Sequence, residues 1–238
     1  MELKLDLHVH SEYSPDGRMT LEEIVQKARE KGLNGVAICD HDRVFSERIA
    51  FLDFMLIPGV EVSTDCGHLL GLFVSKPVAS RIFAQAVAEI HHQGGIAVLA
   101  HPFEHTTDPE TLKPLAPVLD GIEVWNGRAE RKNPKANAMA ETFARTYELC
   151  RFAGSDAHVP EEIGNGVTTV EVDAPTPENV HAALLSGRSV TSGKRGKAVY
   201  VASSQLTRLK KRHAGVLSWC KWLLFAVKCV VQDFFTKS

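Results

Sequence analysis

Short apolar segments rich in β-branched residues alternate along the chain with longer segments in which apolar residues recur at helical spacing. This alternation is typical of repeated βα units that build a parallel sheet. It predicts strands over residues 3–9, 35–39, 56–62, 68–74, 96–100, 121–125, 151–155 and 167–172. Eight such strands in a chain of 238 residues fit an α/β barrel or a closed, distorted relative of one.

Helical spacing predicts helices over residues 20–31, 45–54, 79–93, 134–148 and 176–186. The first has the clearest boundaries, because Thr20 and Glu23 form a capping box at its start and Gly32 follows its last turn. The last begins with "PTPE" and ends at "SGR", which are ordinary start and stop signals for a helix.

The amino-acid composition changes after about residue 203, where a basic segment leads into an apolar one. We therefore predict a barrel domain over residues 1–203 and a basic, then apolar, helical tail over residues 204–238. Within residues 214–231 only Ser218, Lys221 and Lys228 interrupt the apolar run, and the two lysines disfavour a membrane-spanning helix. Two interpretations of residues 214–235 stay open: peripheral contact with a membrane, or packing on the barrel or on a second subunit.

The overall composition excludes several classes of function. A net charge of -2 gives no global basic field, so nucleic acid is not an expected partner. The five cysteines form no CxxC pair and are odd in number, which argues against a disulfide framework and a thiolate zinc site. The first residues lack the pattern of a secretory signal, so the cytoplasm is the expected compartment.

Histidines and carboxylates gather where the predicted strands end, which in a parallel barrel is where active sites lie. His8 and His10 alternate along one strand and so share a face, as do Asp156 and His158. The other candidates at or next to strand ends are Asp40, His41, Asp42, Glu61, His68 and His101. Imidazole and carboxylate ligands without cysteine suit zinc, manganese or iron. So many ligands imply several ions, as in enzymes that hold a hydroxide for phosphoryl transfer.

Six motifs, in this order, resemble the PHP family, named for polymerase and histidinol phosphatase domains: "DLHVHSEYSPDG", "AICDHD", "IPGVEVS", "GHLLGLFV", "GGIAVLAHP" and "GSDAH". The resemblance covers roughly residues 3–172. It implies a distorted (β/α)7 barrel with a trinuclear metal centre, and the expected cofactors are two or three divalent ions (Mn, Zn or Fe). It also implies that His8, His10, Glu61 and Asp156 hold one ion, Glu61, His68 and His101 a second, and Asp16, His41 and His158 a third.

The resulting prediction is a metal-dependent phosphoesterase that hydrolyses a phosphomonoester, a small phosphorylated metabolite or nucleotide, by a metal-bridged hydroxide. The residues assigned to catalysis are Glu61, which would bridge two ions, Asp156 and His101. Arg128 and Arg43 follow predicted strand ends and offer a planar fork to phosphate. Each has the alternative of a solvated loop arginine. Asn126 either binds substrate or stabilises the "NG" turn that it begins.

Three competing functions stay open. A phosphodiesterase or exonuclease acting on short nucleic acid would use the same metals. A non-catalytic, metal-stabilised scaffold tethered by its C-terminal helix would need no substrate. An amidohydrolase also opens with HxH on its first barrel strand, but a modified lysine commonly bridges its metals, and here Glu61 takes that place.

Overall fold

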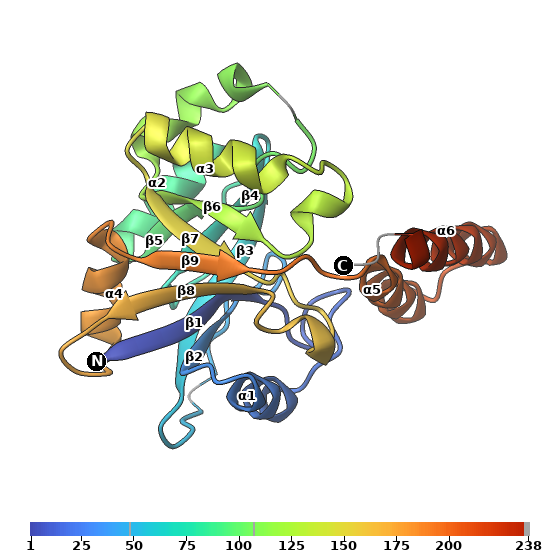
Figure 1. Cartoon of the computed structure of the whole chain (residues 1–238), viewed down its shortest axis with the longest axis horizontal. Coiled ribbons are helices and arrows are strands. Elements are labelled where there is room, and N and C mark those ends of the chain that lie inside the picture. The colour runs from blue at the N-terminus through green and yellow to red at the C-terminus, as the bar shows by residue number, and fades with distance from the viewer. Residues whose placement is uncertain (48, 107, 236–238) are drawn as a thin grey trace.

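A computed structural model of the chain describes residues 1–47, 49–106 and 108–235 (Figure 1). The strands of this part of the chain form one sheet, in the order β7-β6-β5-β4-β3-β2-β1-β8-β9. Their bounds are β1 Glu2–Val9, β2 Gly35–Ile38, β3 Met55–Thr64, β4 Gly67–Leu72, β5 Ile96–Leu99, β6 Gly121–Asn126, β7 Cys150–Gly154, β8 Gly166–Glu171 and β9 Val190–Gly193. The helices are α1 Leu21–Glu30, α2 Phe83–His92, α3 Ala136–Thr146, α4 Pro177–Leu185, α5 Ala198–Lys211 and α6 Val216–Phe235.

The sheet curls into a nearly closed, distorted barrel, as predicted. Backbone N–H of His10 donates to the carbonyl of Ala157 (2.8 Å), so the segment after β7 joins the end of β1. The distortion arises from strand direction: β4 runs antiparallel to both of its neighbours, and β8 and β9 add an antiparallel edge beside β1. All eight predicted strands are present, but β9 was not predicted. Its four residues are mostly exposed and carry no apolar alternation.

The prediction of a helix over residues 45–54 is wrong. The described residues there form a loop in which Phe51 and Phe54 make an isolated bridge and Asp53 takes a left-handed backbone conformation, with φ of 52°. Phe45 and Phe54 are buried, whereas Leu52 is 84% exposed. The apolar residues that suggested helical spacing therefore hold a loop against the core and do not form one face of a helix. The other predicted helices are present, and α1 carries the expected capping box.

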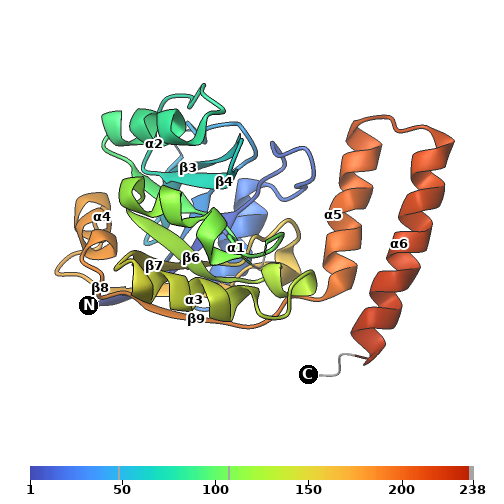
Figure 2. The same cartoon turned by 90° about the horizontal axis from the view of Figure 1, so that it is seen from above.

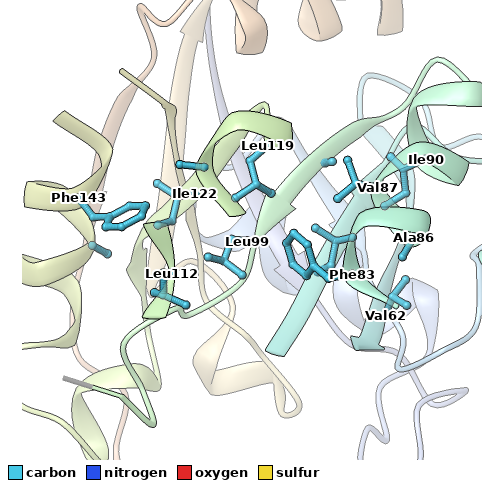
Figure 3. Close-up of a cluster of buried hydrophobic side chains, with 14 of the residues drawn as sticks. Val62, Phe83, Ala86, Val87, Ile90, Leu99, Leu112, Leu119, Ile122 and Phe143 are labelled. Atoms are coloured by element: carbon cyan, nitrogen blue, oxygen red, sulfur yellow. The ribbon is translucent and has the colours of Figure 1, made fainter. Parts of the chain in front are cut away.

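Three apolar clusters of buried residues hold the barrel together. In one, α2 and α3 cover the outer side of the strands from β3 to β6, and Figure 3 shows Phe83 of α2 beside Leu99 of β5. In a second, Ile24 of α1 clusters with residues of β1 and β2. The third draws residues from strands around the sheet, including Leu5 of β1 and Phe152 of β7. Because these clusters are apolar, the polar chemistry is left to one end of the strands.

The last two helices form an antiparallel hairpin that stands beside the barrel (Figure 2). Asp233 of α6 accepts hydrogen bonds from the backbone N–H groups of Ala198 (2.7 Å) and Val199 (2.9 Å), where α5 begins. The helical tail thus starts a few residues before the composition change at 203.

None of the helices in the described residues has the length and apolar character that crossing a membrane requires.

Candidate metal centre

All nine predicted metal ligands come together at one end of the barrel. They reach this place from seven separate segments: the end of β1, the loop after it, the segment after β2, strands β3 and β4, and the segments after β5 and β7. The nine are His8, His10, Asp16, His41, Glu61, His68, His101, Asp156 and His158. Among the described residues, three overlapping groups have ligand atoms within 4.8 Å of one another.

Glu61 of β3 lies at the centre of this cluster. Its Oε1 accepts hydrogen bonds from Nδ1 of His68 (2.7 Å) and Nε2 of His101 (3.0 Å). Its Oε2 faces three more imidazole nitrogens, at 2.9 Å from His41 Nδ1, 3.3 Å from His10 Nε2 and 3.5 Å from His8 Nε2. One carboxylate thus contacts five histidines, the position that a ligand shared between two ions would occupy.

The Oε2 atom of Glu61 is buried without a hydrogen-bond partner, the one such side-chain atom in the described part of the chain. A buried charged oxygen without a partner is costly. Nearby, Nε2 of His8 and Nε2 of His10 lie 3.1 Å apart, and Asp156 Oδ1 is 3.3 Å from His10 Nε2. A divalent cation satisfies such a set of imidazole and carboxylate donors, so the residues present fit the metals that the sequence suggested.

Asp16 lies close to the two histidines with which the resemblance groups it. Its Oδ1 is 3.3 Å from Nε2 of His158 and 3.8 Å from Nε2 of His41. Nδ1 of His158 lies 2.9 Å from the carbonyl of Asp156, which leaves Nε2 to face Asp16. The hydroxyl of Ser14 donates to Asp16 (3.2 Å).

A lysine from the C-terminal hairpin holds the loop that carries Asp16. Nζ of Lys211, the last residue of α5, donates to the carbonyl oxygens of Glu12 (2.6 Å), Ser14 (2.6 Å) and Gly17 (2.8 Å). These three carbonyls bracket Asp16 in the sequence. The tail therefore helps to fix the position of one candidate ligand.

Sequence reasoning missed Glu123, a buried acid in the middle of β6. One of its oxygens lies 3.0 Å from Nδ1 of His8, and the other accepts from the backbone N–H of His101 (2.8 Å). A carboxylate that receives the outer N–H of a ligand imidazole fixes the tautomer and the ring orientation. The available signal was a single acid within the apolar strand "GIEVW".

Two of the nine residues hold strained backbone conformations. His101 has φ of 28° and Asp156 has φ of 55°, values that non-glycine residues rarely adopt. Such strain persists only where the surrounding structure enforces it, and it clusters at functional sites. Each residue lies two positions after the end of a short strand whose last residues are buried, and that packing fixes where the chain must turn.

The concentrated charge changes the acidity of these groups. Burial lowers the pKa of His41 and His101, but the Glu61 carboxylate outweighs it and raises both to about 9. Burial, together with the neighbouring His158, lowers the pKa of His10 to about 3. Burial would raise the pKa of Glu61, yet the adjacent His41 and His8 hold it well below its ordinary value.

The structure shows Asn126 in the turn-stabilising role that was its alternative, whereas Arg128 is not a solvated loop arginine but lies in a nearly buried ion pair. The Arg128 guanidinium is about one-tenth exposed and makes two hydrogen bonds to Glu162, from Nε (2.7 Å) and Nη2 (2.5 Å). The buried side chain of Asn126 accepts from the backbone N–H groups of Arg128 and Ala129 and so supports the turn. Arg43 lies over the ring of the exposed Tyr13, 4.0 Å from its centroid.

We expect Glu162→Gln to lower the free energy of unfolding by about 3–5 kcal/mol, because it leaves the buried Arg128 charge without its partner. Glu162 also accepts from the backbone N–H of His158 (3.0 Å), so the loss should loosen that part of the cluster. Urea denaturation measures the change. Glu161→Gln, at the exposed neighbouring position, is the control and should stay within about 0.5 kcal/mol of the unmodified protein. Equal stability of the two variants would contradict the structural role of the pair.

The chain is similar to several known proteins. An uncharacterized protein of Methanocaldococcus jannaschii is 27% identical over 187 residues, 75% of this chain and 75% of that protein. A 5'-3' exoribonuclease of Escherichia coli is 30% identical over 173 residues, 66% of this chain and 57% of the exoribonuclease. A two-domain protein of Bacteroides vulgatus, described as containing a predicted PHP-like metal-dependent phosphoesterase, has a TM-score of 0.65 at 22% identity, over 87% of this chain and 70% of that one.

Two family models match the chain in sequence order. The model described as PHP domain matches residues 6–102, and the model described as PHP-associated matches residues 134–189. The first match contains seven of the nine clustered residues, and the second contains Asp156 and His158. Together the two matches span more than half of the chain, which therefore belongs to the PHP family.

Proposed function

We propose that this protein is a metal-dependent phosphoesterase that hydrolyses small phosphomonoesters, with more than one divalent ion held by the nine clustered residues. One observation carries the proposal: the buried Glu61 Oε2 has no hydrogen-bond partner although three imidazole nitrogens surround it within 3.5 Å. A divalent cation would satisfy this oxygen together with the surrounding imidazole nitrogens, and the overlapping ligand groups would accommodate more than one ion. Divalent ions bound there would acidify a coordinated water and offset the charge of phosphate oxygens.

The residues of the chain then have separate tasks. Glu61 would connect two of the ligand groups, and Asp156 and His101 would hold ions on either side of it. Glu123 keeps the His8 ring in one orientation through its Nδ1. Among the described residues no carboxylate pairs with Arg43, in contrast to Arg128 and Asn126, and its place over Tyr13 would leave its charge available to a phosphate.

A small substrate is favoured over nucleic acid by the distribution of charge. Residues 1–203 carry 28 acidic and 20 basic side chains, an excess that repels a long polyanion. The second candidate is a phosphodiesterase or exonuclease, and the 30% identity to an Escherichia coli exoribonuclease is the observation that favours it. Both candidates use the same centre, so substrate length decides between them.

Hydrolysis by manganese-reconstituted protein tests the proposal, measured as phosphate release from monoesters, as phenol release from a diester and as nucleotide release from an oligonucleotide. The substrates are nucleoside monophosphates, sugar phosphates, an aryl phosphodiester and a short 5'-phosphorylated oligoribonucleotide. We expect one of the monoesters to be hydrolysed with the highest kcat/KM. Faster cleavage of the oligonucleotide would establish the nuclease instead. A folded, metal-loaded protein that cleaves none of these compounds would favour the metal-stabilised scaffold.

A further inference from the structure

Helix α6 presents a wide apolar face to its surroundings. Nine large apolar side chains along it are between 49% and 80% exposed: Val216, Leu217, Leu223, Leu224, Val227, Val230, Val231, Phe234 and Phe235. At 100° per residue these side chains occupy one continuous side of the helix. A contiguous apolar patch of this kind on a folded chain marks a site of interaction.

The opposite side of α6 is already used by the hairpin itself. Cys229 is its one buried residue, and it lies in a small cluster with Ala198 and Ala202 of α5. The indole N–H of Trp222 donates to the carbonyl of Ala202 (2.9 Å). Since these contacts fix which side of α6 faces α5, the apolar face points away from it. Figure 2 shows the hairpin projecting beside the barrel, with α6 on the outer side.

The charge of the tail is opposite to that of the barrel. Residues 204–238 contain seven lysines and arginines and a single acid, Asp233, which is engaged at the start of α5. Lys221 and Lys228 are seven positions apart, so they lie one above the other along one border of the apolar face. The exposed Lys210 and Arg212 add charge where the hairpin turns. An apolar face bordered by cations complements a surface that is apolar inside and anionic outside.

We propose that α6 binds the surface of an anionic lipid bilayer, lying in the interface with its apolar face among the acyl chains. Burial of the exposed apolar side chains and attraction of the basic residues to lipid phosphates would both contribute. A second copy of the chain would complement the apolar face, but it would bring two positively charged tails together. The anionic membrane satisfies both features at once, and the inference does not depend on what the metal centre hydrolyses.

Sedimentation with vesicles tests this proposal on the full chain. We expect binding to vesicles of mixed phosphatidylcholine and phosphatidylglycerol, and much weaker binding to phosphatidylcholine alone. Lys221→Glu with Lys228→Glu should weaken binding at least about 20-fold, because each lysine near such a surface contributes roughly a five-fold factor. Leu224→Glu with Val227→Glu should weaken it by about 100-fold or more.

The matched control is Leu52→Glu with Ile82→Glu, which adds the same charge at exposed apolar positions of the barrel and should reduce binding far less. Circular dichroism shows that each variant remains folded, and light scattering gives the oligomeric state. Equal vesicle binding by the Leu224→Glu, Val227→Glu variant and by the Leu52→Glu, Ile82→Glu control would overturn the proposal. So would a stable dimer of the unmodified protein that ignores vesicles and is dissociated by Leu224→Glu with Val227→Glu, because that result assigns the face to a second copy.

Discussion

Glu61→Gln is expected to reduce phosphate release by at least about a thousand-fold, the effect of losing some 4 kcal/mol of transition-state stabilisation. Glu61 contacts five imidazoles through two oxygens. A glutamine would replace one of these oxygens with an NH₂ group, which donates hydrogen bonds and cannot ligate a cation. The metal content should therefore fall together with the rate. Phosphate release and inductively coupled plasma mass spectrometry measure the two effects on the same sample.

A matched control for this substitution is Glu22→Gln, which makes the same chemical change on the exposed side of α1. It should retain both its metal and its activity. A Glu61→Gln protein with normal metal content and less than ten-fold loss of activity would remove Glu61 from the centre of the mechanism. A protein that loses metal and activity while its circular dichroism is unchanged would support the assigned role.

Metal binding is expected to raise the melting temperature of chelator-treated protein by about 10 °C or more. An ion present at a thousand times its dissociation constant contributes about 4 kcal/mol, and 1 kcal/mol shifts the melting temperature of a chain of this size by about 2–4 °C. Manganese and zinc should act more strongly than magnesium or calcium, because most of the nine side chains are imidazoles. Differential scanning fluorimetry measures the shift.

The rise in melting temperature that metal causes should become larger between pH 6.5 and pH 9. Without metal, burial opposes but the Glu61 carboxylate raises the pKa of His41 and His101 to about 9, so both rings are protonated at neutral pH. Their contribution to stability is complete below about 6.5 and is lost as the pH rises through about 9. Protons also compete with metal for these nitrogens, so metal binds more tightly as they leave. A metal-induced shift that shrinks with rising pH would contradict the ligand assignment.

The sequence predicted the strands and the clustered residues well, for a common physical reason. Short apolar runs have few alternatives to buried strands, and a polar residue that follows such a run must lie at the barrel end. His101 after β5 and Asp156 after β7 could be placed by that rule alone. Their contacts within the cluster depend on the closure of the sheet, which the number of strands suggested, whereas the grouping of the ligands came only from the resemblance.

Features that depend on long-range partners could not be predicted in the same way. Arg128 follows a strand end as a phosphate-binding arginine would, but Glu162 lies 34 residues away in sequence and captures its guanidinium. Glu123 is an ordinary acid until the fold places His8 against it. The helix prediction for residues 45–54 failed because local apolar spacing cannot distinguish a helix from a loop that inserts two phenylalanines into the core.

The three hydrogen bonds of Lys211 set the order in which the centre can be completed during synthesis. The loop around Asp16 leaves the ribosome nearly two hundred residues before the ammonium group that holds its carbonyls. The loop of the newly made barrel therefore lacks these three hydrogen bonds until α5 has emerged. A shorter product ending near residue 203 would keep all nine clustered side chains and yet never reach that last step of assembly.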